Sequence, residues 1–277
     1  MLEHSIQSKD GTRLRLVQWT PEHIRGEVLL VHGLAEHAGR YGHVARALTA
    51  AGWRVTLLEL RGHGKSEGKP GAVSRWSEYV EDLQAAADFL RKPFVLVAHS
   101  MGGLVALDAL RGPLRGQVQA LALSNPLTGV AVVAPRLLSM AKVVLSKLLP
   151  QLPLKNPLDP KDISRDHAVV AAYIADPMVF STIRPRWATE MEAAIERVQA
   201  HASQYDLPLL AMVGTGDRIC DHTSMLKLAD GWGSPPGEEP RVSRQVYEGL
   251  YHEIFNEPEQ GQVLADLVRW LDGAVTP

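Results

Sequence analysis

The 277-residue sequence has a single cysteine, Cys220, and no run of five or more like charges. One cysteine excludes an internal disulfide framework and is typical of a reducing compartment. Lys and Arg total 29 against 31 Asp and Glu, a net charge of −2, which gives no support for a nucleic-acid partner. Residues 1–16 have no apolar segment of the kind that a signal peptide carries, so a cytoplasmic location is expected.

The sequence also has no long uncharged hydrophobic run. Its most apolar window, residues 127–149, is interrupted by Pro135, Arg136, Lys142 and Lys147. A membrane-spanning helix needs about 20 largely uncharged apolar residues, so this window is not predicted to span a bilayer.

Motifs for metals and nucleotides are missing as well. There is no H-E-x-x-H, no C-x-x-C and no G-x-G-x-x-G that opens a helix after a strand. "GHGKS" at 62–66 ends like a phosphate-binding loop, but Glu59 occupies the position of its first glycine. The sequence therefore predicts neither a metal site nor a cofactor.

What is present is an alternation of strand and helix patterns, which favours an α/β fold with a mostly parallel sheet of about eight strands flanked by helices. An antiparallel hairpin is expected at the amino terminus, between residues near Ser5 and 13–19. The further strands are predicted at 27–33, 54–60, 94–98, 120–124, 207–214 and 241–249, and helices at 41–51, 76–91, 101–110 and 258–271.

A proline-rich segment interrupts this alternation and predicts an inserted helical cap at 125–185, within a core formed by 1–124 and 186–277. The segment has helical patterns at 136–149 and 164–175. On the first helix, one face carries the apolar residues 137, 138, 141, 144, 145, 148 and 149, opposite Lys142, Ser146 and Lys147. Packing against the core is the simplest role for this face, and a lipid-facing or substrate-facing role is the alternative.

The stretch "VAHSMGG" joins a strand to a helix through a serine. A G-x-S-x-G turn at such a junction exposes a nucleophilic serine, although the first glycine is Ala98 in this sequence. Alanine adds only a methyl group, and Gly102 and Gly103 remain on the helix side. Ser100 is therefore predicted to be a nucleophile, and a role as a helix N-cap is the plain alternative.

A serine nucleophile needs a base, an acid that orients the base, and donors for the oxyanion. Asp217 and His252 follow the last two predicted strands, in the chain order Ser, Asp, His, at the sheet edge where sites of open α/β sheets form. Asp221 competes for the acid role but is interpreted as a helix N-cap. The plain alternatives are a turn aspartate for Asp217 and a surface histidine for His252.

The oxyanion donors are predicted to be two backbone N–H groups. Met101, which follows the nucleophile, supplies one, and the loop "HGLAEHAGRY" supplies the other at Leu34.

Together with other motifs along the chain, these segments resemble a known family. "HGLAEHAGRY", "RGHGKSEG", "AHSMGG", "SNPL", "DPMV", "GTGDRICD" and "YEGLYHEIFNEPE" are similar to the α/β-hydrolase superfamily, and within it to the monoacylglycerol lipases and lysophospholipase-like relatives. The matches extend from residue 32 to residue 259. The resemblance implies an α/β-hydrolase fold, the catalytic triad Ser100, Asp217 and His252, and oxyanion amides at Leu34 and Met101.

The resemblance also implies substrate-binding positions. Glu36 matches a glutamate of the polar head-group pocket, and Arg40 and His99 lie in the matched motifs. Cys220 matches a cysteine beside the site that makes the family sensitive to thiol reagents. The departures are Ala98, which could tilt the elbow, and Leu34, a larger residue than usual, which could narrow the acyl pocket.

The predicted function is a serine esterase that cleaves monoacylglycerols without a cofactor. Its partner is a small lipid ester, with peripheral membrane contact through the cap; the sequence makes no prediction of oligomeric state. Within the fold, a lysophospholipase, a carboxylesterase or a serine aminopeptidase remains an alternative. A non-catalytic binding protein of the same fold is the alternative from another class.

Overall fold

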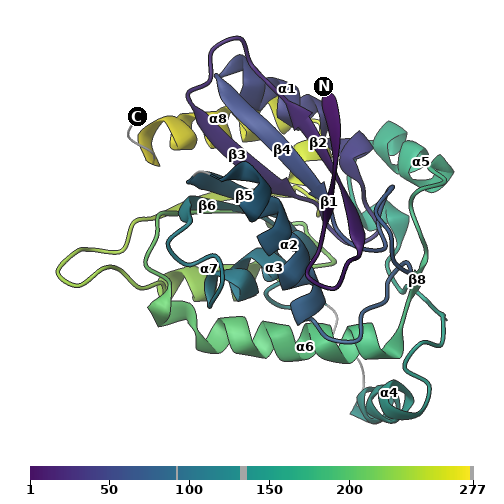
Figure 1. Cartoon of the computed structure of the whole chain (residues 1–277). Helices are drawn as coiled ribbons and strands as arrows, with labels where there is room; N and C mark the ends of the chain where they lie inside the picture. Colours follow the sequence, from purple (N-terminus) through teal and green to yellow (C-terminus); the bar gives the residue numbers. More distant parts are fainter. Residues whose placement is uncertain (92, 132–135, 275–277) are drawn as a thin grey trace.

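The computed structural model describes residues 1–91, 93–131 and 136–274, with only the backbone for 136–141. One eight-stranded sheet has the order β1-β2-β4-β3-β5-β6-β9-β10 (Figure 1). The β1/β2 and β2/β4 pairs are antiparallel and the other pairs are parallel. The strands are β1 Leu2–Gln7, β2 Arg13–Trp19, β3 Gly26–Val31, β4 Trp53–Glu59, β5 Phe94–His99, β6 Val118–Ser124, β9 Leu209–Gly214 and β10 Val242–Tyr247.

Helices cover both faces of the sheet (Figure 1). One apolar cluster joins the sheet to α1 (Gly42–Ala50) and α8 (Gln260–Ala274). A second cluster joins the opposite face to α2 (Ser77–Leu90), α3 (Met101–Leu110), α6 (Pro185–Ala200) and α7 (His222–Asp230). The predicted α/β-hydrolase fold, with its mostly parallel sheet of about eight strands, is confirmed.

The central strands are buried on both faces, which is why they consist of nearly continuous apolar runs. All six residues of β5 and of β9 are buried. In β1, at the edge, exposure alternates along the strand. The predicted elements agree with the structure to within a few residues, but neither the short strand pair within 125–185 nor the helix α6 was predicted. Pro185 at its start, a favoured first helical residue, was a local signal for it.

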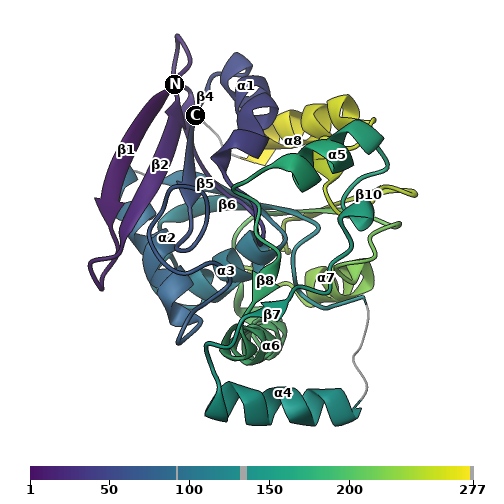
Figure 2. The ribbon, with the colours of Figure 1, turned by 90° about the vertical axis from the view of Figure 1, so that its right-hand side faces the viewer.

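Residues 125–185, called the insert from here on, leave the sheet after β6 and return at α6 (Figure 2). Within the insert, two short strands form an antiparallel pair. The elements of the insert are α4 (Arg136–Leu148), β7 (Leu154–Lys155), η2 (Pro160–Asp162), α5 (His167–Ala175) and β8 (Thr182–Ile183). In Figure 2, α6 is seen end-on and α4 crosses below it, at the lower margin of the molecule.

The orientation of α4 differs from the simplest expectation. Two of its polar side chains contact α6: Lys142 pairs with Glu192, and the hydroxyl of Ser146 lies 2.8 Å from that of Thr189. Among the described side chains, Leu145 is half-buried, and the apolar side chains at the end of α4 and just after it are exposed, to 45% at Val143, 54% at Val144, 74% at Leu148 and 52% at Leu149. Core packing of 144, 148 and 149 is therefore wrong, because the polar edge of α4 finds hydrogen-bonding partners on α6. Side chains 137, 138 and 141 lie outside the described residues.

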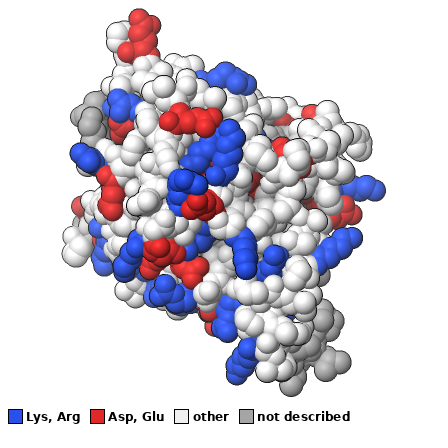
Figure 3. Space-filling model, turned by 45° about the vertical axis from the view of Figure 1, so that its right-hand side comes forward, with Lys and Arg blue, Asp and Glu red and all other residues white. Residues whose placement is uncertain are grey.

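The face drawn in Figure 3 carries interspersed charges of both signs, in keeping with the net charge of −2. Within the described residues, no helix has the length and apolar character needed to cross a bilayer.

Candidate active site

Ser100 lies at the junction of β5 and α3, in a backbone conformation that is costly for any residue with a side chain. Its φ is 51° and its ψ is −121°. A non-glycine residue with positive φ is uncommon and is frequently found at functional sites. The Ser100 N–H donates to the Ser124 carbonyl at 3.1 Å, and the Ser100 side chain makes no capping bond to α3. The N-cap alternative for Ser100 is therefore wrong, and the hydroxyl is left for another partner.

The glycines after Ser100 are required by close packing. A Cβ at Gly102 would lie 2.5 Å from the carbonyl oxygen of His32, and one at Gly103 would lie 2.6 Å from Cβ of Pro126. Ala98 has no such conflict: it lies within β5 in register with Val31 and Leu123, and its methyl group is buried. The elbow therefore accommodates alanine at position 98, and the glycines that it needs are those on the helix side.

Three side chains from distant segments form a hydrogen-bonded relay. The hydroxyl of Ser100 lies 2.8 Å from Nε2 of His252, and Nδ1 of His252 lies 2.8 Å from an oxygen of Asp217. The second oxygen of Asp217 accepts the backbone N–H groups of Ile219 and Cys220. The side chains of all three residues are buried. Nucleophile, base and orienting acid are thus arranged as acyl transfer by a serine requires.

Asp221, the competing acid, caps α7 by accepting the Thr223 N–H at 3.0 Å. The N-cap interpretation of Asp221 is confirmed. A surface role for His252 is wrong, since its side chain is buried and joined to Asp217. Asp217 accepts a turn hydrogen bond from the Ile219 N–H, but a turn role alone does not describe it, because it is also buried and joined to His252.

The pKa of His252 reflects two opposing effects. Burial is the largest single effect and would lower it, but the adjacent Asp217 carboxylate, together with Cys220, raises the pKa of His252 well above its usual value. The Asp217 pair therefore stabilises the imidazolium that forms when this ring takes a proton.

His99 is a second imidazole near the relay, with its ring centre 4.8 Å from that of His252. Burial lowers the pKa of His99 to about 4, so this ring is neutral at pH 7. Its Nδ1 lies 3.0 Å from the Ser124 carbonyl, an acceptor that requires the proton on this nitrogen. A neutral His99 adds no positive charge that would oppose protonation of His252.

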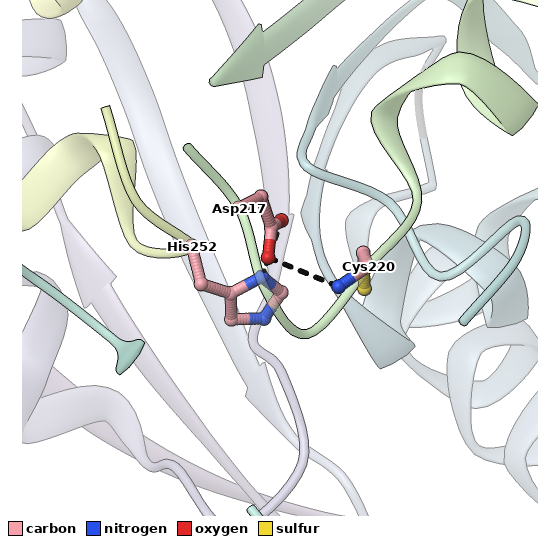
Figure 4. A group of neighbouring side chains, drawn as sticks. All are labelled: Asp217, Cys220 and His252. Atoms are coloured by element: carbon pink, nitrogen blue, oxygen red, sulfur yellow. Dashed lines mark hydrogen bonds and ion pairs between the residues drawn. The ribbon is translucent and has the colours of Figure 1, made fainter. Parts of the chain in front are cut away.

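Asp217, Cys220 and His252 each offer a ligand atom within 4.8 Å of the others, which is close enough for a metal ion (Figure 4). Both ring nitrogens of His252 already have hydrogen-bonding partners, Asp217 and Ser100. A metal ion here would compete with these hydrogen bonds for the ring nitrogens of His252. The absence of a metal site therefore remains a prediction. Burial raises the pKa of Cys220, which keeps its thiol protonated at neutral pH.

Glu36 holds the loop in which the second oxyanion donor is predicted. Its carboxylate accepts the Gly33 N–H at 2.8 Å, the Tyr41 hydroxyl at 2.7 Å and the Arg40 Nε–H at 3.3 Å. Leu34 directly follows Gly33, so Glu36 determines the path of the backbone at Leu34. Met101 is the first residue of α3, where helix geometry leaves the N–H without an intrahelical acceptor.

Arg40 connects this loop to the segment that carries His252 and to the insert. Its guanidinium pairs with Glu36 and with Glu253, and lies 4.7 Å from the ring centre of Tyr173 in α5. Burial and the nearby Glu36 carboxylate raise the pKa of Glu253 to about 7. The structure thus gathers the predicted substrate-binding residues around the relay, with Glu36 and Arg40 already engaged by protein partners.

Asn125 is a positioning residue that the sequence analysis missed. Its side-chain NH2 donates to the carbonyl oxygens of Tyr251 at 3.0 Å and His252 at 2.7 Å, and its side-chain oxygen accepts the Gly214 N–H at 2.8 Å. It has a φ of 39°, a region in which asparagine is among the more tolerant residues. The one local signal was its position in "SNPL", directly after the strand beside the elbow.

Comparisons with known proteins agree with this geometry. A family model described as "Serine aminopeptidase, S33" matches residues 22–259. The chain belongs to the serine aminopeptidase S33 family. Among curated proteins, a monoacylglycerol lipase of Mycolicibacterium smegmatis is 41% identical, covering 97% of this chain and 96% of the relative. The monoglyceride lipase of Homo sapiens is 30% identical, covering 98% and 90%.

A solved structure shares the architecture over nearly the whole chain. The crystal structure of a monoacylglycerol lipase from Paleococcus ferrophilus has a TM-score of 0.86 at 30% identity, covering 95% of this chain and 99% of that chain. The resemblance to the α/β-hydrolase superfamily and its monoacylglycerol lipases is therefore confirmed.

Proposed function

We propose that this S33-family protein hydrolyses monoacylglycerols to fatty acid and glycerol, with Ser100 as nucleophile, His252 as base and Asp217 as orienting acid. The relay of two 2.8 Å hydrogen bonds between these residues is the observation that carries the proposal. The full-length similarity to monoacylglycerol lipases supports the choice of ester.

The geometry supports a two-step reaction. His252 Nε2 takes the Ser100 proton as Oγ attacks the ester carbonyl, and Asp217 stabilises the imidazolium through Nδ1–H. The amides of Leu34 and Met101 are proposed to bind the tetrahedral oxyanion. The imidazolium then protonates the leaving glycerol oxygen. Water, deprotonated by His252, attacks the acyl-enzyme and releases the acid, so the proposed reaction needs no cofactor.

The contacts of Glu36 argue against a serine aminopeptidase. Such an enzyme needs a free acidic group to bind the substrate amine, and Glu36 is the candidate in the matched motifs. Its carboxylate already accepts three hydrogen bonds from the protein, so at most one acceptor position remains for a substrate. That position suits a single hydroxyl of glycerol better than an ammonium group.

The substrate class can be tested with hydrolysis rates on monoacylglycerols of graded chain length, di- and triacylglycerols, lysophosphatidylcholine, nitrophenyl esters and a proline anilide. We expect kcat/KM to be highest for monoacylglycerols, because the remaining acceptor position of Glu36 suits a glycerol hydroxyl. Activity confined to short soluble esters would support the catalytic roles of the relay and would contradict the proposed substrate class.

We further propose that the insert caps the site and that α4 docks on lipid surfaces. Within the described part of the chain, nine of the thirteen exposed large apolar side chains belong to the insert. The exposed Val144 and Leu148 lie on α4, whose polar edge is occupied by α6. Apolar residues on the outward face of a helix, with the exposed Lys147 beside them, suit the interface of an anionic bilayer.

Vesicle sedimentation tests the role of α4. Replacing Val144 and Leu148 together with glutamate is expected to lower partitioning onto phosphatidylcholine/phosphatidylglycerol vesicles about tenfold or more, since burying one such side chain is worth roughly 1.5–3 kcal/mol. Hydrolysis of a soluble ester should be unchanged.

The matched control is Ile24→Glu, at a side chain that is 45% exposed and lies in the loop before β3. It should bind vesicles like the parent protein. Equal loss in both variants, or no binding by the parent, would contradict a docking role for α4.

A further inference from the structure

The loop that carries His252 is held from two sides by the insert. On one side of His252, the Glu253 N–H donates to the carbonyl of Ile163 at 2.8 Å. On the other side, the Tyr251 N–H donates to a carboxylate oxygen of Glu257 at 3.1 Å. Ile163 belongs to the insert, and Glu257 is bound to the insert through Arg165. Both neighbours of the histidine therefore depend on the same short stretch of the insert.

Glu257 is wholly buried, and its charge is satisfied by donors from both segments. The oxygen that accepts the Tyr251 N–H also accepts the Arg165 backbone N–H at 3.0 Å, and the other oxygen accepts the Arg165 side-chain Nε–H at 2.8 Å. A buried carboxylate is tolerated only when paired and hydrogen-bonded in this way. The Ser164 hydroxyl adds a bond to the Asn256 carbonyl at 3.0 Å.

We propose that Glu257 is a positioning residue for His252 and that Arg165 of the insert acts through it, so that the insert determines where the imidazole lies relative to Ser100. This inference rests on the proposed catalytic role of His252. A displacement of Tyr251 is transmitted to the next residue, His252, through one peptide unit. A misplacement of about 1 Å in such a group can lower a rate about 100-fold.

Glu259 provides a matched control within the same cluster. It also pairs with Arg165, but its side chain is 47% exposed. Among the contacts of the described residues, it shares with Glu257 the bond to Arg165 and not the bond to Tyr251. If the carboxylates only neutralised Arg165, replacing Glu257 or Glu259 would have the same effect on kcat. If Glu257 positions His252, only the replacement of Glu257 should lower kcat strongly.

The test compares Glu257→Gln, Arg165→Met and Glu259→Gln with the parent protein. The amide in Glu257→Gln puts an NH2 where an acceptor is needed, so the bond to Tyr251 or to Arg165 is lost. We expect kcat on a soluble ester to fall about 10- to 100-fold with KM nearly unchanged. Arg165→Met should lose less, about 3- to 10-fold, because Tyr251 keeps its acceptor. Glu259→Gln should stay within about twofold, as expected for an exposed pair.

The readout that separates positioning from stability is the rate at which a fluorophosphonate modifies Ser100, measured beside the thermal unfolding midpoint. Positioning predicts that this rate falls together with kcat in Glu257→Gln. Parent-like kcat and labelling rates in a folded Glu257→Gln, with only a lower unfolding temperature, would overturn the proposal.

Two further outcomes are distinguishable. If Glu257→Gln does not fold, the test rests on Arg165→Met. A kcat of Arg165→Met within twofold of the parent value would then overturn the proposal. If the parent itself neither hydrolyses esters nor reacts with the fluorophosphonate at Ser100, the proposed function fails, whatever the variants do.

Discussion

Replacing Ser100 with alanine is expected to lower kcat/KM on an ester substrate by about 10⁵-fold or more, because the members of such a relay act as a unit. The hydroxyl lies 2.8 Å from Nε2 of His252, so its loss removes the nucleophile and leaves the base without a proton to accept. Circular dichroism should show an unchanged fold, since alanine removes the hydroxyl alone from the strained turn.

Ser66→Ala is the control for the loss of a partly buried hydroxyl. Ser66 accepts the Arg15 N–H and donates to the Glu59 carbonyl, and it is no member of the relay. We expect parent-like activity with a modest loss of stability, on the order of 1 kcal/mol. A fluorophosphonate should label the Ser100 peptide in the parent and in Ser66→Ala. Substantial turnover by Ser100→Ala would refute the nucleophile, and an unlabelled parent would favour a non-catalytic binding protein.

Replacing Asp217 with asparagine is expected to lower kcat about 10⁴-fold, because the amide no longer fixes the tautomer that presents Nε2 to Ser100. In the parent, Asp217 accepts the proton on Nδ1 at 2.8 Å, which leaves Nε2 free to accept the serine proton. The measurement is kcat on a soluble ester, with the fold checked by circular dichroism.

The same variant should move the pH dependence in a defined direction. Catalysis needs neutral His252, so activity is lost as the pH falls through the pKa of His252, which Asp217 raises well above its usual value despite burial. Without that carboxylate, burial dominates and lowers the pKa. The acid limb of the residual activity should therefore lie at a lower pH in Asp217→Asn than in the parent.

Asp221→Asn is the matched control, four positions along the same loop. Asp221 caps α7 and is not hydrogen-bonded to His252, and asparagine caps helices about as well as aspartate. Activity within about twofold of the parent is expected. A large loss in Asp221→Asn together with an active Asp217→Asn would transfer the role of the acid to Asp221.

The relay could be predicted from sequence because each member follows a strong local signal. Ser100 lies in a strand-to-helix turn, and Asp217 and His252 lie shortly after β9 and β10. The carboxyl ends of parallel strands meet at one edge of a sheet, so the order Ser, Asp, His already implied proximity. The alanine at position 98 does not affect this prediction. The backbone of the His32 segment approaches the elbow at Gly102, where a side chain would not fit, and not at Ala98.

The residues that hold the histidine loop could not be predicted in this way. Asn125 and Glu257 act through bonds to segments that are distant in sequence, Tyr251 and His252 for the first and Arg165 for the second. Nothing in the neighbourhood of either residue in the sequence specifies its partner. Such contacts form only when the insert and the histidine loop come together in the folded protein.

The elbow, the relay and most of the order of strands and helices follow from periodicity, turn chemistry and strand ends, which are local properties of the chain. Which face of α4 lies inward depends instead on its neighbours in the fold. The apolar stripe predicted packing, yet Lys142 and Ser146 found partners on α6 and left Val144 and Leu148 exposed. A helix with two faces does not specify its neighbour; the groups that the neighbour offers decide which face is buried.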